Sequence, residues 1–229
     1  MKRLLLGALL VLVLVSCASL ATGEMEEGLP APGLQSLPLP TAPAVHPSPL
    51  PTAPSIEDAG DVPFSIKEMH PTDVDNSTLP ITPVEELNRT GKPQEYDIEA
   101  YRLVVDGLVD NPLSLSYENL LSRPQVTETV LLICPGFFWD NATWTGTPLS
   151  LILEEAGISP EAATVRFVAG DGYQRTLSLE EAMADGVFLA YEVNGETLPA
   201  EHGYPIRLVA RHQYGSRWVK WVEHIEVEA

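Results

Sequence analysis

A proline-rich stretch in the first quarter of the chain limits the possible folds more than any other feature. Nine prolines lie between Pro30 and Pro54, as in the run LPLPTAPAVHPSPLPTAP. Proline fixes the backbone angle φ and has no N–H to donate, so this stretch cannot form a helix or a sheet ladder. We therefore expect residues 18–79 to be a disordered, extended linker. A PxxP ligand for a peptide-binding domain is the alternative interpretation.

The linker leaves residues 80–229 for a folded part. About 150 residues are enough for one domain with a hydrophobic core of its own. The segment shows no internal repeat. The sequence therefore predicts a single domain over residues 80–229.

The N-terminus, residues 1–17, resembles the signal peptide of a bacterial lipoprotein. Lys2 and Arg3 precede an apolar segment, Leu4–Val15, that is short for a membrane span. The following letters, LVSC, have the form of a lipobox, in which the cysteine is lipidated and becomes the new N-terminus. We expect lipidated Cys17 to anchor an extracytoplasmic protein to the cell membrane or the outer membrane. A plain secreted protein is the alternative.

The charge balance excludes one class of partner. The chain has 13 Lys and Arg against 32 Asp and Glu, a formal net charge of −19. A surface that binds nucleic acid needs an excess of cations to neutralise phosphates, so we expect no nucleic acid partner. The chain has two cysteines. With Cys17 lipidated, Cys134 has no intramolecular partner, and we expect no disulfide.

The folded part alternates strands with short helices. Hydrophobic and β-branched runs predict strands, in one case a strand with its loop, at residues 101–107, 126–133, 164–173, 187–193, 204–210 and 218–229. Short helices are expected at residues 116–121, at 149–156, and from a capping box at 178–181 to Gly186. The whole pattern predicts a mixed α+β domain that is mostly β.

Local signals define several ends of these elements. Thr147 and Pro148 suit the N-cap and first turn of the helix at 149–156, which Gly157 can close. Asn194-Gly195 predicts a type I′ turn after the strand at 187–193. Asp110–Pro112 marks a turn between the first strand and the first helix.

Two features stand out as candidates for chemistry. Cys134 lies at the end of an apolar strand and is followed by PGFFW. The segment 202–222 has no Asp or Glu, yet it contains His202, Arg207, Arg211, His212, Arg217 and Lys220. Arg and Lys side chains suit an anionic ligand. The alternatives are that the cations balance acidic neighbours, and that Cys134 is an inert core thiol.

Several motifs in order carry a family resemblance. They are YRLVVDGLVDNPLSLSYENLL, a strand ending in Cys134, WTGTPLSLILEEAG, DGYQRTLSLEEAM, LAYEVNGETLPAEHGYPIRLVA and YGSRWVKWVEHIEV. Their order resembles the sulfite-oxidase-type molybdopterin-binding domain, over about residues 80–229. The resemblance implies that family's β-rich α+β fold and a molybdenum-molybdopterin cofactor.

The resemblance also implies roles for single residues. The family's thiolate ligand to molybdenum falls on Cys134. Its contacts to the pterin phosphate and ring fall on His202 and Arg207. In the next loop, whose sequence is SRWVKW, the family's backbone and lysine contacts to the cofactor fall on Trp218, Val219 and Lys220. The acid-free basic segment found from charge alone contains the same residues.

The sequence departs from both branches of the family. Sulfite-oxidising members place Arg soon after the metal-binding cysteine, whereas no Arg occurs between Cys134 and Arg166. The reductase branch carries an N-terminal Asn and aromatic pattern that the segment LPITPVEELNRTG lacks, and one of its side chains falls near Ala169 and Gly170. No haem motif is visible, so an electron partner would be external.

Two functions remain open at this point. The first is a membrane-tethered, extracytoplasmic molybdopterin oxidoreductase that acts on a small oxo-substrate by oxygen-atom and electron transfer. The second is a non-catalytic binding or interaction module that keeps the fold without a complete cofactor site. Loss of metal and of cellular role on Cys134→Ser would favour the first.

Overall fold

The structure is a computed structural model that describes residues 64–229. The expected signal peptide, with Cys17, and the expected linker up to residue 63 lie outside the described residues. Within residues 64–229, none of the helices has the length and apolar character needed to cross a membrane.

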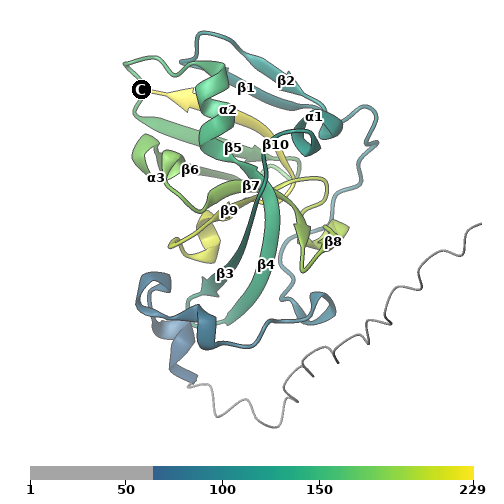
Figure 1. Cartoon of the computed structure of the whole chain (residues 1–229), viewed down its shortest axis with the longest axis vertical. Helices are drawn as coiled ribbons and strands as arrows, with labels where there is room; N and C mark the ends of the chain where they lie inside the picture. The colour runs from purple at the N-terminus through teal and green to yellow at the C-terminus, as the bar shows by residue number, and fades with distance from the viewer. Residues whose placement is uncertain (1–63) are drawn as a thin grey trace, which may run out of the picture. The chain divides into compact units, whose positions relative to one another are not determined.

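Two five-stranded sheets form the domain (Figure 1). The first has the order β2-β1-β10-β5-β6, and its strands are β1 (Leu103–Gly107), β2 (Leu113–Leu115), β5 (Thr164–Ala169), β6 (Gln174–Ser178) and β10 (Val222–Glu228). β1 and β10 pair in parallel and the other neighbours are antiparallel. The C-terminal strand β10 therefore lies between β1 and β5. Its pairing with β1 joins the two ends of the domain.

The second sheet has the order β3-β4-β7-β8, with β9 paired to β7. Its strands are β3 (Val126–Cys134), β4 (Phe138–Pro148), β7 (Val187–Val193), β8 (Glu196–Thr197) and β9 (Arg207–Ala210). β3 and β4 form a long antiparallel hairpin whose register runs without a break from Val126↔Gly146 to Cys134↔Phe138. Cys134, the predicted metal ligand, thus belongs to the last residue pair of the ladder, next to the turn.

Three short α-helices complete the fold: α1 (Tyr117–Leu121), α2 (Leu149–Ala156) and α3 (Leu179–Met183). Ser116 and Ser178 cap α1 and α3 through capping boxes, which satisfy the first free N–H groups of each helix. One face of α2 is buried, and Gly157 ends the helix at φ 71. The main core contains this face together with residues of both sheets, such as Val105 and Phe188.

Most of the predicted elements are confirmed, with differences at their ends. The helix that begins after Ser178 ends at Met183 and not at Gly186. The strand expected from residue 204 begins at Arg207. The side chain of Thr147 does not cap α2: its hydroxyl donates to the carbonyl of Leu120, and Pro148 is the N-cap.

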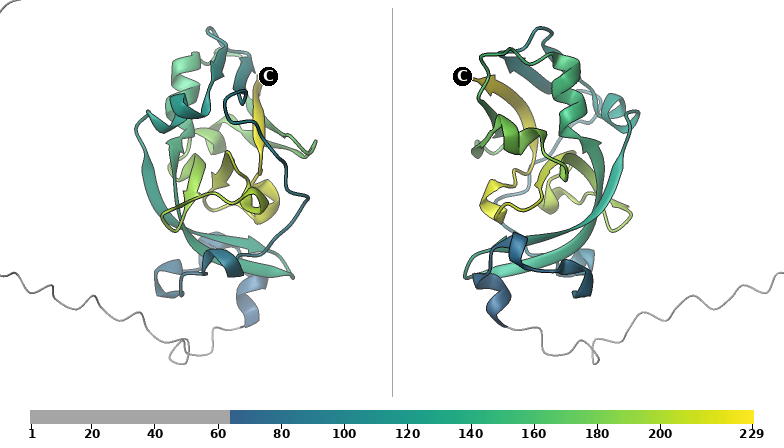
Figure 2. Two further views of the ribbon diagram at one scale, coloured as in Figure 1. Left: turned by 90° about the vertical axis from the view of Figure 1, so that its right-hand side faces the viewer. Right: turned by 60° about the vertical axis from the view of Figure 1, so that its left-hand side comes forward.

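The boundary of the folded part is corrected. The expected linker ran to residue 79, but residues 64–79 fold into the short 3-10 helices η2 (Phe64–Glu68), η3 (Pro71–Asp73) and η4 (Asn76–Thr78). They lie across the end of the β3–β4 hairpin (Figures 1 and 2). Ile66 packs there against Leu131 and Ile133, which gives the segment a small core of its own. A further 3-10 helix, η5 (Val84–Glu86), follows.

Candidate cofactor and metal site

The two faces of the β3–β4 hairpin have different roles. In the antiparallel register Cys134 is opposite Phe138, and Leu132 is opposite Asp140. Opposed residues share a face and side chains alternate along a strand, so these four point to one side of the hairpin. All four line a cavity of about 320 Å³. The hairpin therefore presents the thiol of Cys134 to this cavity, and its back faces the short helices at 64–79.

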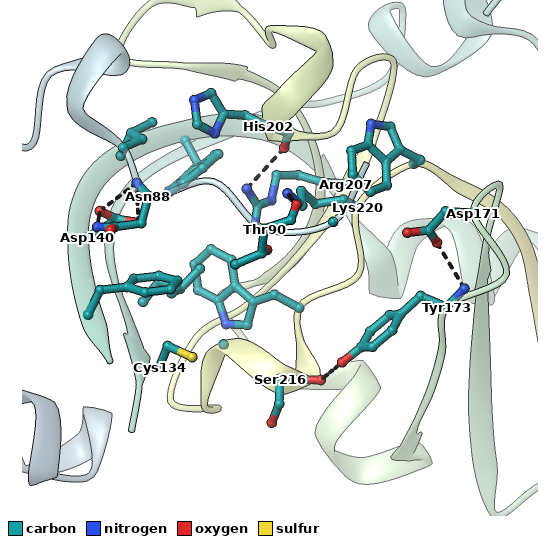
Figure 3. Close-up of a pocket in the computed structure, with 18 residues that line it drawn as sticks. Asn88, Thr90, Cys134, Asp140, Asp171, Tyr173, His202, Arg207, Ser216 and Lys220 are labelled. Atoms are coloured by element: carbon teal, nitrogen blue, oxygen red, sulfur yellow. Dashed lines mark hydrogen bonds between the residues drawn. The ribbon is translucent and has the colours of Figure 1, made fainter. Parts of the chain in front are cut away.

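Segments distant in the sequence form the other walls of the cavity. They are the chain before β1, the loop after β5, η6 (Ala200–His202), β9 and the segment from η7 (Gly215–Arg217) to Trp221. Figure 3 shows the labelled side chains around the cavity, with the thiol of Cys134 on the hairpin side. The structure thus brings Cys134 together with four predicted cofactor contacts: His202, Arg207, Trp218 and Lys220.

Val219 is the exception among the predicted cofactor contacts. Its side chain is fully buried in the core and does not line the cavity. Its carbonyl accepts a 2.7 Å hydrogen bond from the N–H of Leu208. Val219 therefore connects the segment behind the cavity to β9.

Arg207 is the most enclosed cation of the site. Its guanidinium carbon lies 4.5 Å from the centroid of the Trp144 ring and 5.3 Å from that of Trp218. One terminal nitrogen donates to the carbonyl of His202 at 3.0 Å. Burial lowers the pKa of Arg207 to about 10, against the attraction of Asp140. The side chain stays charged at neutral pH and is held in one orientation by two aromatic faces.

His202 and Lys220 flank this guanidinium. Burial, with the charge of Arg207 second, lowers the pKa of His202 to about 4, so its imidazole is neutral at pH 7. The same two causes lower the pKa of Lys220 to about 8. The ammonium of Lys220 donates to the carbonyls of Glu201, at 2.9 Å, and of Thr90. Two protonated cations and a neutral imidazole therefore converge on the cavity near neutral pH.

A glycine allows these side chains to come together. Gly203 has φ 115, in the region that favours glycine. A Cβ there would lie 2.9 Å from Cβ of Arg207 and 3.2 Å from Cβ of Lys220. Only a residue without a side chain leaves room for both cations at this point.

Asp140 is a buried carboxylate that sequence reasoning did not single out. Its oxygens accept hydrogen bonds from the backbone N–H of Asn88 at 3.2 Å and from the side-chain amide of Asn88 at 2.8 Å. Burial raises the pKa of Asp140, and Asn88 and Arg207 oppose the rise. Asp140 therefore supplies a negative charge on the same face as Cys134. The only sequence signal was a polar residue inside the aromatic run FFWDNATW.

Cys134 is a free, partly buried thiol. Burial raises its pKa, so without a metal the thiol is protonated at neutral pH. Cys134 was predicted to be the one protein ligand of the molybdenum, whose other sulfur ligands come from the cofactor. Within the described residues, His, Cys, Asp and Glu side chains form no group of three or more that could hold a metal ion.

Unpaired polar atoms test whether the walls fit a phosphate-bearing cofactor. Nε2 of His202, Nε of Arg207 and Nε1 of Trp144 are buried and have no hydrogen-bond partner. Buried donors are almost always paired, and each unpaired one costs about 1–3 kcal/mol. A group with several acceptor oxygens, such as a phosphate, would satisfy them. These polar atoms and the thiol of Cys134 in the same cavity therefore fit a phosphate-bearing, metal-carrying cofactor.

Comparisons with known proteins agree with this fit. The family model described as the oxidoreductase molybdopterin-binding domain matches residues 90–229. An uncharacterized oxidoreductase of Bacillus subtilis, YuiH, is 35% identical over 135 residues, which cover 58% of this chain and 68% of the relative. Sulfite oxidase of Arabidopsis thaliana is 32% identical over 189 residues, which cover 65% of this chain and 48% of that protein.

The likeness extends to larger enzymes and to a solved structure. An NADPH nitrate reductase of Neurospora crassa is 31% identical over 169 residues, but only 17% of that protein is covered. The sulfane dehydrogenase SoxCD of Paracoccus pantotrophus matches with a TM-score of 0.61 and 32% identity, over 64% of this chain and 43% of that one. The chain thus spans half or less of these three proteins. The chain belongs to the oxidoreductase molybdopterin-binding domain family, which makes it an oxidoreductase domain with molybdopterin as its cofactor.

Proposed function

We propose that this protein is a membrane-tethered, extracytoplasmic molybdopterin oxidoreductase that transfers an oxygen atom to or from a small oxo-substrate. One observation carries the proposal: a single cavity contains the thiol of Cys134 and, from other segments, the cluster of His202, Arg207 and Lys220. The cysteine is suited to a metal and the cluster to a phosphate. A molybdopterin cofactor carries both groups.

Different side chains of the cavity would bind different parts of such a cofactor. Cys134 would give a thiolate to the molybdenum, because a metal's charge deprotonates a thiol that is neutral without it. Arg207, Lys220 and the neutral imidazole of His202 would hold the phosphate. Trp144 and Trp218 enclose Arg207 and keep water from it. The cofactor supplies the oxygen-atom and electron transfer, and the protein fixes its position.

The charges of the cavity favour an uncharged substrate over sulfite. Among the described residues that line it, Arg207 is the only arginine, and the tryptophans and Asp140 occupy its surroundings. Asp140 places a carboxylate on the face that carries Cys134. A dianion would meet this carboxylate without an arginine beside the cysteine to offset it. We therefore infer that a small neutral oxo-compound is the substrate.

The sequence supports the location. The charged start, the apolar segment and the letters LVSC of residues 1–17 have the form of a lipoprotein signal peptide, and Cys17 would carry the lipid. The proline-rich segment that follows suits a spacer between membrane and domain. Electrons would pass to or from a separate partner protein.

Purification of the full-length protein from a host that makes molybdopterin tests the function. The expected result is one molybdenum and one pterin per chain, and turnover of an S-oxide or N-oxide in preference to sulfite. Protein that stays free of both groups would refute the oxidoreductase proposal and favour the binding module. Cys17→Ser is the matched variant for the tether: it should move the protein from the membrane fraction to the soluble extract without changing its molybdenum content.

A further inference from the structure

One wall of the cavity is built differently from the others. Residues 66–91, here called the strap, form 3-10 helices but no strand or α-helix. Three residues of the strap are buried: Ile66, Pro71 and Leu87. In β4, on the facing wall, seven of eleven residues are buried; the strand pairs with β3 over residues 138–146 and with β7 over residues 144–148. Segments with few buried apolar groups and no ladder open at lower free energy. The strap is therefore the wall that opens most easily. All of it except Thr90 and Gly91 lies outside the family match.

The first part of the strap is fixed to the back of the β3–β4 hairpin by one buried amide. The side-chain amide of Asn141 donates to the carbonyl of Asn76 at 3.1 Å and to that of Leu79 at 3.2 Å. The amide of Asn76 donates in return to the side-chain oxygen of Asn141 at 3.1 Å. The backbone N–H of Thr82 donates to the carbonyl of Asn141 at 2.8 Å. A few side-chain hydrogen bonds thus replace a ladder here.

The last part of the strap passes to the front of the hairpin and forms one side of the cavity, which is partly open to solvent. Leu87, Asn88, Thr90 and Gly91 line it. Asn88 is bonded to Asp140, and the carbonyl of Thr90 accepts from Lys220. Because both partners are cavity residues, a strap that leaves the hairpin uncovers the cavity.

We propose that the strap is the movable wall through which the cofactor enters, and that its return retains the cofactor. This inference rests on the proposed function. His202 and Arg207 are only 2% and 5% exposed, yet each has an unpaired nitrogen suited to the cofactor's phosphate. Because these nitrogens are themselves buried, a phosphate can pair with them only when part of the surrounding wall moves, and the sheet walls cost more to move than the strap.

Cofactor release from the purified full-length holoprotein tests the inference. Asn76→Ala removes two strap bonds, those from its side-chain amide to the side chain of Asn141 and to the carbonyl of Thr129, without touching a residue that lines the cavity. It should speed the release of pterin and molybdenum about tenfold. Thr82→Val is the second variant: it keeps the shape of the side chain and removes the bond from the N–H of Asn141. Arg123→Ala is the control, because it breaks the ion pair between Arg123, just after α1, and Glu155 of α2, away from the strap.

Hydrogen exchange completes the test. In cofactor-free protein, amides of the strap should exchange faster than those of β3 and β4, and cofactor loading should slow them. The control variant should release cofactor at the wild-type rate. Release from both strap variants at the wild-type rate, or strap amides as slow as those of the hairpin, would overturn the inference. Wild-type protein that never contains pterin would overturn the proposed function itself, so the two failures differ.

Discussion

The guanidinium of Arg207 lies over the indole of Trp144, with its central carbon 4.5 Å from the ring centroid. Trp218 lies on another side at 5.3 Å, and its ring meets that of Trp144 edge to face. The pair of rings shields the cation from water, and Asp140 offsets its charge. A buried cation is stable in such a site only while these neighbours remain.

Arg207→Met should therefore destabilise the cofactor-free protein by about 2–3 kcal/mol, because it leaves the buried carboxylate of Asp140 without its cation. Adding Asp140→Asn should recover part of the loss. Urea unfolding of the single and double variants measures both values. Arg175→Met is the control: Arg175 stacks on Tyr173 at 4.4 Å but is exposed, so its loss should cost about 1 kcal/mol or less. Equal losses at Arg175 and Arg207 would contradict the account.

Gly203→Ala should disturb the cation cluster directly. A backbone at φ 115 strains any residue with a Cβ, by about 1–3 kcal/mol, and the new methyl group would meet Arg207 and Lys220. We expect a lower melting temperature and a clear loss of cofactor content. Gly172→Ala is the matched control, since Gly172 also has positive φ but nothing within 4 Å of its Cβ position. A normal cofactor content in Gly203→Ala would show that the cluster does not depend on this close approach.

The neutral imidazole of His202 predicts a pH dependence of stability. The unfolded chain takes up a proton near the ordinary pKa of 6.5, whereas the folded protein takes it up only near pH 4. Stability should therefore be complete above pH 6.5 and fall toward pH 4, by at most about 1.4 kcal/mol per pH unit from this group. His202→Gln cannot titrate and should show a shallower fall in cofactor-free protein. Since both proteins share the same carboxylates, identical slopes would contradict the assignment.

The central hairpin shows what the sequence could and could not predict. The strand ending in Cys134 was predicted from its apolar run, but its partner β4 was not. Both faces of β4 are covered, one by the cavity and core and the other by the strap. Asp140 and Asn141 are consequently buried polar residues on opposite faces, and they interrupt the alternation of polar and apolar residues in the first half of the strand.

The first part of the strap, residues 66–79, was assigned to the linker for a related reason. It is mostly polar, with few apolar residues to indicate a core, and most of its side chains are exposed. The strap is held by tertiary hydrogen bonds, such as those of Asn141 with Asn76 and of Asn88 with Asp140. No local sequence pattern predicts such long-range partners. In contrast, the capping box at Ser178, the Asn194-Gly195 turn and the helix stop at Gly157 depend on neighbouring residues only, and these predictions were confirmed.

The site was predictable only in part. The acid-free segment and the family resemblance indicated the cavity residues His202, Arg207, Trp218 and Lys220, because they lie in one stretch of sequence. Asp140 and Trp144 face the same cavity from β4, and their contribution follows from strand register. Long-range register is set by the whole fold, so a single sequence does not reveal it.

Molybdenum and pterin content of Cys134→Ser protein tests the central claim most directly. Serine keeps the size of the side chain but gives no thiolate, and we expect stability to change by about 1 kcal/mol or less. Phe137→Ser is the matched control, since Phe137 lies in the same turn, is 75% exposed and does not line the cavity. The account predicts that wild type and Phe137→Ser contain equal molybdenum, and that Cys134→Ser loses the metal and its activity while staying folded. Full molybdenum content and activity in Cys134→Ser would contradict it.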